Sequence, residues 1–168
     1  MTIQPSGGPG QEPPRDDPGQ DPEHDPARDA STSRRLPASP ARVYAAFGDP
    51  GELARWWGPA GFGNSFETFE FRPGGDWRFT MHGPDGRNYA NQSRFLVLEP
   101  GRQVLLRHLN APAFELRVLL EPAGEGQTLL HWRQRFDDAG LAAQLRALVE
   151  PANEQNLDRL AALLAGAR

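Results

Sequence analysis

Residues 138–165 read "DAGLAAQLRALVEPANEQNLDRLAALLA", and this last stretch of the chain decides the fold. Its apolar residues recur with a roughly helical period, which is typical of a long helix with one apolar face. Pro151 interrupts the pattern and is expected to kink the helix or to divide it in two. The apolar stripe consists of Leu141, Leu145, Leu148, Val149, Ala152, Leu157, Leu160, Ala161 and Leu164.

Strand patterns and short turns alternate along the segment before this helix. In "DWRFTMH", Trp77, Phe79 and Met81 fall on one face of a strand and mostly polar residues on the other. The turns between the strands leave no room for crossover helices, so we expect an antiparallel sheet. The predicted strands cover residues 32–36, 65–73, 76–82, 88–101, 102–109, 113–122 and 128–136.

Two short helices are predicted between the first two strands. Ser39-Pro40 and Asp49-Pro50 each supply an N-cap residue followed by proline at the first helical position. The second helix ends at Gly58-Pro59. An antiparallel sheet with one apolar face needs a cover, and the C-terminal helix is the only element long enough. The sequence therefore predicts an α+β fold in which a curved sheet wraps around that helix.

The stretch "RWWGPAGF" at residues 55–62 places two tryptophans at the end of the second helix. Neighbours on a helix point about 100° apart, so Trp56 and Trp57 are not expected to face the same core. We expect one ring to fill the gap between the short helices and the mouth of the sheet, and the other to cover the outside of that junction. Both rings then serve packing, or one of them forms a wall of a cavity.

The composition changes sharply near residue 31. Residues 1–30 contain seven prolines, four glycines and no aromatic residue, with a net charge of −5. Such a segment buries too little apolar surface to offset its ordering entropy. We therefore predict a disordered acidic tail over residues 1–31 and one folded domain over residues 32–168.

The composition of the predicted domain excludes several classes of protein. Its sixteen arginines nearly balance fifteen acidic residues, so no electrostatic footprint for nucleic acid exists. No apolar run is long enough to span a membrane. Residues 1–30 lack the apolar stretch of a secretory signal, so we do not expect them to act as one. Cysteine is absent, which excludes disulfides and fits the cytoplasm.

Four motifs, in the order found here, resemble the START-like helix-grip superfamily called SRPBCC. Within it, the closest resemblance is to the branch named after the activator of the ATPase of the ninety-kilodalton heat-shock protein. The resemblance implies a seven-stranded antiparallel sheet that grips the C-terminal helix, with a cavity between them. Many members bind apolar small molecules, and some are cyclases or hydrolases. The motifs are "FGDPGELARWWGPAGF", "FRPGGDWRFTMHGPDG", "FLVLEPGRQVLL" and "LVEPANEQNLDRLAALL".

Together, the inward-facing pattern and the resemblance predict a site for an apolar small molecule between the sheet and the last helix. The predicted lining combines large rings with a few polar groups, as ligand cavities do. No metal or other cofactor is expected, because the histidines lack metal-ligand spacing. The predicted cavity residues are Trp57, Trp77, Phe79, Met81, Tyr89, Phe95, His108, Phe114, Leu116, Trp132, Gln134 and Asn153.

Other interpretations stay open at this point. An enzyme on the same scaffold would use His108, Tyr89 or Gln134, or an acid–base pair such as His108 with Glu70. A co-chaperone is the alternative that the branch name suggests, and a homodimer is also compatible with the sequence. Asn153 and Asn156 interrupt the apolar stripe; we favour a role in capping a helix break at Pro151 over contact with a ligand.

Overall fold

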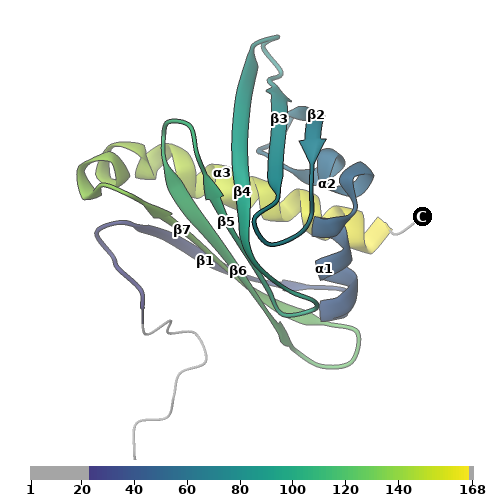
Figure 1. Cartoon of the computed structure of the whole chain (residues 1–168). Coiled ribbons are helices and arrows are strands. Elements are labelled where there is room, and N and C mark those ends of the chain that lie inside the picture. Colours follow the sequence, from purple (N-terminus) through teal and green to yellow (C-terminus); the bar gives the residue numbers. More distant parts are fainter. Residues whose placement is uncertain (1–22, 167–168) are drawn as a thin grey trace, which may run out of the picture.

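The structure, a computed structural model, describes residues 23–166 as one curved sheet with three helices (Figure 1). The seven strands lie in the order β1-β7-β6-β5-β4-β3-β2, and all pairs are antiparallel. The predicted α+β helix-grip fold is thereby confirmed. The elements are β1 (Asp29–Leu36), α1 (Pro40–Gly48), α2 (Pro50–Trp56), β2 (Gly63–Phe69), β3 (Asp76–His82), β4 (Asn88–Glu99), β5 (Gln103–His108), β6 (Phe114–Pro122), β7 (Thr128–Phe136) and α3 (Ala139–Gly166).

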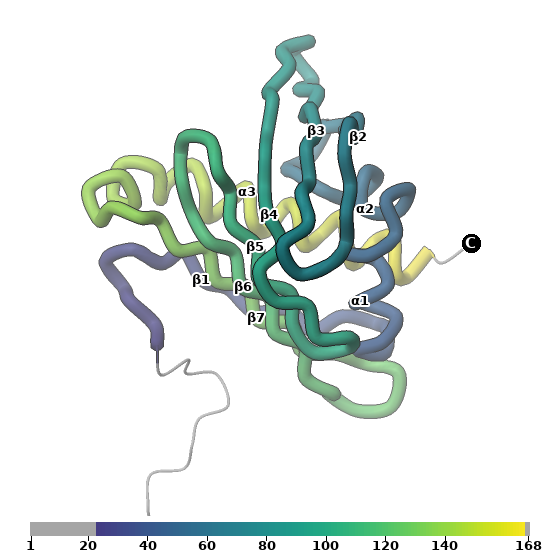
Figure 2. The backbone as a smooth tube through the Cα atoms, viewed as in Figure 1, coloured from purple at the N-terminus to yellow at the C-terminus, as the bar shows by residue number. Residues whose placement is uncertain are grey.

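The first strand lies beside the last one, as the path of the chain in Figure 2 shows. β1 begins at Asp29, so the predicted start at Thr32 is too late. The side chain of Asp29 is buried and accepts hydrogen bonds from the Arg135 guanidinium, with Nε at 2.7 Å. This ion pair explains why a polar segment joins the sheet. Residues 1–22 of the predicted tail lie outside the described residues.

The two short helices begin where their N-caps predict. The Ser39 hydroxyl accepts from the Arg42 N–H, and the Asp49 carboxylate accepts from the Glu52 N–H. The side chains of Arg42 and Glu52 then join α1 to α2 through two hydrogen bonds of 2.9 and 2.6 Å. α2 is thus fixed to α1 at its start.

Both tryptophans at the end of α2 are buried, so the expectation that one covers the outside is wrong. Trp56 is the last helical residue; its indole N–H donates to the Ala46 carbonyl at 3.0 Å, and its ring meets the Phe47 ring edge-on. Trp57 is the C-cap, with extended φ and ψ of −69° and 134°. The helical angle between neighbours therefore does not apply to the pair, and Trp57 turns inward under the sheet.

The centre of the core is a solid stack of rings on β3 and β4. Trp77 stacks on Phe79 with ring centroids 4.1 Å apart, and it lies nearly parallel to Phe95 at 6.0 Å. Trp57 meets Trp77 edge-on at 5.0 Å. All four side chains are buried. These rings fill the volume between the sheet, α2 and the second half of α3.

α3 is one continuous helix of 28 residues that runs through Pro151, so the proline does not divide it. The buried residues of its second half are Asn156, Leu157, Leu160 and Leu164, whereas the first half buries Ala142 alone. Leu148, part of the predicted apolar stripe, is 71% exposed. The grip of the sheet is therefore strongest on the second half.

Polar contacts fasten this second half of α3 to β1. Arg34 donates to Glu154 at 2.8 Å and to Asp158 at 2.7 Å, and the Thr32 hydroxyl donates to Glu154. The first half of α3 is joined to the chain near β1 by Arg146, which donates to the carbonyls of Asp29 and Pro26. No helix within residues 23–166 combines the length and apolar character needed to cross a membrane.

The exposed proline inside α3 gives a test of helix continuity. Proline removes one intrahelical hydrogen bond and crowds the preceding turn. We expect Pro151→Ala to raise the free energy of unfolding by about 1–3 kcal/mol in chemical denaturation. Gln144→Ala, at an exposed position of the same helix, serves as the control and should change it by less than about 0.5 kcal/mol. A less stable Pro151→Ala protein would mean that α3 needs a bend there to meet the sheet.

Candidate functional site

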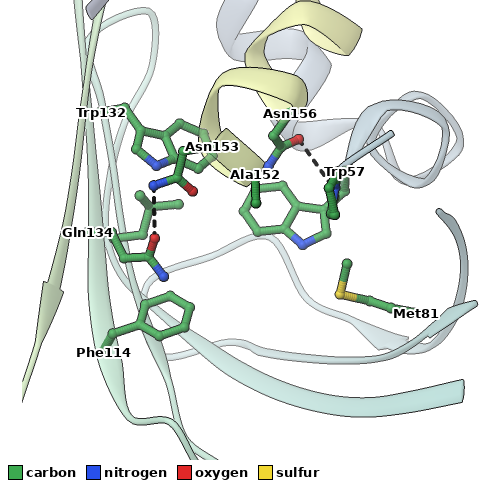
Figure 3. Close-up of a pocket in the computed structure, with 11 residues that line it drawn as sticks. Trp57, Met81, Phe114, Trp132, Gln134, Ala152, Asn153 and Asn156 are labelled. Carbon is green, nitrogen blue, oxygen red and sulfur yellow. Dashed lines mark hydrogen bonds between the residues drawn. The ribbon is translucent and has the colours of Figure 1, made fainter. Parts of the chain in front are cut away.

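A half-open cavity of about 130 Å³ lies between β6, β7, the middle of α3 and the chain that follows α2 (Figure 3). It sits beside the solid ring stack rather than within it. Its walls combine indole, phenyl and thioether groups with three side-chain amides. The lining residues are Trp57, Gly58, Pro59, Met81, Phe114, Leu116, Trp132, Gln134, Ala152, Asn153 and Asn156.

Part of the predicted set meets at this cavity. The residues that line it are Trp57, Met81, Phe114, Leu116, Trp132, Gln134 and Asn153. Trp77, Phe79 and Phe95 lie in the ring stack instead. Tyr89 is 44% exposed and packs on the Phe62 ring, and His108 lies behind Phe114.

The amides of α3 hold neighbouring elements and do not cap a helix break at Pro151, so that favoured expectation is wrong. Asn153 Nδ2 donates to Gln134 Oε1 at 3.0 Å, which joins α3 to β7 across the cavity wall. Asn156 Oδ1 accepts from the Gly58 N–H at 3.1 Å, which joins α3 to the end of α2. Both bonds link residues far apart in sequence, and no local pattern indicates them.

The segment of residues 57–62, which closes one side of the cavity, is attached to α3 by polar side chains. Gln155 Oε1 accepts from the Ala60 N–H at 3.1 Å. The Arg159 guanidinium lies under the same segment and donates to backbone carbonyls only. Its acceptors are the carbonyl oxygens of Arg55, Trp57, Gly58, Pro59 and Phe62, at 2.6–3.1 Å. Burial lowers the pKa of Arg159 from its ordinary value.

Gly58 permits this attachment through its backbone conformation. Its φ is +95°, a region that residues with a side chain rarely adopt. A Cβ atom there would come within 2.6 Å of Met81 Cε, which is in the cavity wall. Gly58-Pro59 was predictable from the sequence as a helix end but not as cavity wall, because its tertiary position depends on Asn156 and Arg159.

His108 is a buried structural histidine. Its Nδ1 lies 2.9 Å from the Pro112 carbonyl oxygen, and its Nε2 lies 2.8 Å from Asn91 Oδ1. Its ring stacks on Phe114 at 4.6 Å. Glu70 accepts instead from Arg72 and the Asp76 N–H, so the acid–base pair of His108 with Glu70 is wrong. Burial lowers the pKa of His108.

The other histidines of the strands form networks on exposed surface. His82 lies 2.7 Å from both Ser65 Oγ and Asn88 Oδ1, and His131 contacts Ser33 and Glu121. None of these residues lines the cavity. Within residues 23–166, no group of three or more histidine and acidic side chains is placed to hold a metal ion.

Comparisons with known proteins agree with this architecture. The family model described as Activator of Hsp90 ATPase homolog 1-like protein matches residues 37–165. A solution structure of an Arthrobacter aurescens protein is 25% identical with a TM-score of 0.78, covering 83% of this chain and 87% of that one. A crystal structure of a Chromobacterium violaceum protein is 28% identical with a TM-score of 0.71, covering 81% and 96%. The comparison with curated proteins gives no match.

The attachment of the 57–62 segment can be tested through Arg159. Arg159→Ala leaves five backbone carbonyls without this donor, and we expect a loss of about 2 kcal/mol of unfolding free energy. Arg55→Ala removes an exposed guanidinium beside the same segment and is expected to cost under about 0.5 kcal/mol. Urea denaturation of both variants measures the difference. If the two variants had equal unfolding free energies, the contacts of Arg159 with the carbonyls would contribute nothing to stability.

The buried histidine predicts a specific pH dependence. Because the pKa of His108 is lower in the folded protein than its ordinary value of 6.5, the unfolded chain binds the proton first as pH falls. Stability from this group is therefore complete above pH 6.5 and is lost as pH falls toward the folded pKa. In His108→Gln we expect a smaller drop in unfolding free energy between pH 7.5 and pH 5.5, measured by urea denaturation. If the unfolding free energies of the native protein and His108→Gln changed in parallel with pH, His108 would not be the cause of the loss of stability.

Proposed function

The chain belongs to the Activator of Hsp90 ATPase homolog 1-like protein family, and we propose that its cavity holds a small, mainly apolar molecule. The observation that carries the proposal is a half-open, mainly apolar cavity of about 130 Å³ between the sheet and α3, beside the stack of Trp77, Phe79 and Phe95. A ligand that fills this space removes the apolar surface of the walls from water and gains packing contacts with them.

The size of the cavity indicates the size of the ligand. An apolar cavity of about 150 Å³ is large enough to bind benzene, and this one measures about 130 Å³. Drug-sized ligands occupy roughly 300–1,000 Å³. The resting cavity therefore suits a single substituted ring, and a larger ligand requires a wall to move.

The chemistry of the walls favours binding over catalysis. A general acid or base must reach the substrate directly or through one water. The lining residues include no acid, histidine or arginine, and the nearest buried histidine, His108, is separated from the space by the Phe114 ring. Amides and indoles orient a ligand but do not transfer protons readily at neutral pH. Binding of a chaperone, the other alternative, has no observed feature in its favour.

Thermal unfolding with toluene as the probe tests the proposal. A ligand that binds only the folded state raises its stability by mass action, so near-saturating toluene should raise the melting temperature by about 3 °C or more. Ala152→Leu should abolish this rise, because the larger side chain occupies the cavity. Ala147→Leu makes the same change at an exposed position of α3 and should keep the rise.

Two outcomes would count against a ligand cavity here. No toluene-dependent shift in the native protein would contradict the proposal directly. An equal shift in the native protein, Ala152→Leu and Ala147→Leu would place toluene elsewhere on the molecule.

A further inference from the structure

The side-chain amide of Asn156 stands in the cavity wall with its orientation fixed by the backbone. Asn156 is only 6% exposed, and its Oδ1 accepts the Gly58 N–H at 3.1 Å. A backbone N–H can only donate, so the oxygen faces Gly58 and the amino group faces the other way. In Figure 3 the amide nitrogen lies on the side of Ala152, which lines the same cavity one helical turn earlier.

The amino group of Asn156 is an unpaired donor that reaches open space. No residue within 23–166 accepts a hydrogen bond from Asn156 Nδ2. In this part of the chain, the unpaired side-chain atoms that are fully buried are Asn64 Oδ1, Trp77 Nε1 and Trp132 Nε1. Asn156 Nδ2 is not one of them, so it keeps some accessible surface, and the space that Asn156 lines is the cavity. A ligand can therefore meet this donor without a rearrangement of the wall.

The other polar groups of the wall do not supply the missing acceptor. Trp57 is 8% exposed, and its Nε1 is a further donor without a partner in residues 23–166 and without full burial. Figure 3 shows this nitrogen turned toward the space between Phe114 and Met81. The bond between Asn153 and Gln134 uses one amino group and one carbonyl, so that pair leaves one of each. Open donors in the cavity therefore outnumber open acceptors.

The charge of the walls favours a neutral acceptor on the ligand. No charged side chain lines the cavity, and the nearby Arg159 guanidinium donates to five backbone carbonyls instead. A carboxylate placed beside Asn156 would lose water without gaining a counter-ion, which is unfavourable. A carbonyl oxygen accepts the same hydrogen bond without that cost.

We propose that the ligand is a neutral carbonyl compound whose oxygen accepts a hydrogen bond from Asn156 Nδ2. This assignment rests on the proposed function, since it names the class of molecule that the same cavity selects. The apolar walls take the hydrocarbon part of the ligand. The Gly58 N–H holds the amide in place before the ligand arrives, so little ordering of the donor is needed on binding.

Toluene and benzaldehyde test the inference because they have nearly the same shape and differ in the acceptor. The measured quantity is the ratio of the toluene Kd to the benzaldehyde Kd, by calorimetric titration of the full chain. The chain contains no lysine, so no side-chain amine condenses with the aldehyde. We expect the ratio to fall at least about fivefold in Asn156→Asp, which can still accept the Gly58 N–H but has lost the donor.

Gln155→Glu is the matched control for this substitution. It makes the same change from amide to carboxylate one residue earlier, where Gln155 Oε1 accepts the Ala60 N–H. Gln155 is exposed and does not line the cavity, so the ratio should stay at its native value. An equal fall in both variants would trace the effect to charge alone. A fall in Trp57→Phe without one in Asn156→Asp would make the indole the donor, and either result overturns the assignment to Asn156.

The side-chain amide signals of the native protein give a second readout by ¹⁵N-edited NMR, which needs no substitution. Benzaldehyde should shift the Asn156 signals well beyond the shift that toluene causes. The signals of Asn64, whose amino group donates to the Ala54 and Trp57 carbonyls, should respond equally to both. If toluene binds but neither the Kd ratio nor the Asn156 signals distinguish the probes, the carbonyl assignment is overturned and the cavity proposal stands. If neither probe binds the native protein, both fail.

Discussion

The structure depends on how the carboxyl end of α2 is satisfied inside the molecule. The last carbonyls of a helix have no intrahelical donors, and burying them unpaired is costly. Here the Arg159 guanidinium supplies donors to the carbonyls of Arg55, Trp57 and three later residues, while Asn156 accepts the Gly58 N–H. These bonds fix a short helix that has little stability of its own. They also determine where Trp57 lies, and hence one wall of the cavity.

Alternation and capping were sufficient to predict the elements. β3 spans the predicted residues 76–82, and α1 and α2 begin at the predicted prolines. The start of β1 was missed because "DAS" carries no strand pattern; its place in the sheet comes from the Asp29–Arg135 ion pair. The orientation of Trp57 was missed because it depends on whether the helix ends before or after that residue. A difference of one residue in where α2 ends therefore decides whether the Trp57 ring is predicted to face the solvent or the core.

The candidate site was predictable only in part, because it too depends on contacts between elements that are distant in the sequence. The alternation of apolar and polar residues places Trp77, Phe95 and Trp132 on the inner face of the sheet. It does not reveal which of these rings pack in the solid core and which line the cavity. That division follows from packing between elements: Trp77 lies between Phe79 and Phe95, whereas Trp132 faces the amides of α3. The roles of Asn156 and Arg159 were likewise invisible, because their partners lie about a hundred residues earlier.

Pro151 separates two parts of α3 that are held with unequal strength. The second half is fixed by buried leucines and by polar contacts with β1 and the 57–62 segment, whereas the first half buries only Ala142 and leaves Leu148 in solvent. Ala152 and Asn153 stand at the boundary, in the cavity wall. The residues that α3 contributes to the cavity wall, Ala152, Asn153 and Asn156, all follow Pro151, so this wall belongs to the firmly held half. Molecules that fit the resting volume of about 130 Å³ therefore bind without displacing the best-anchored part of the helix.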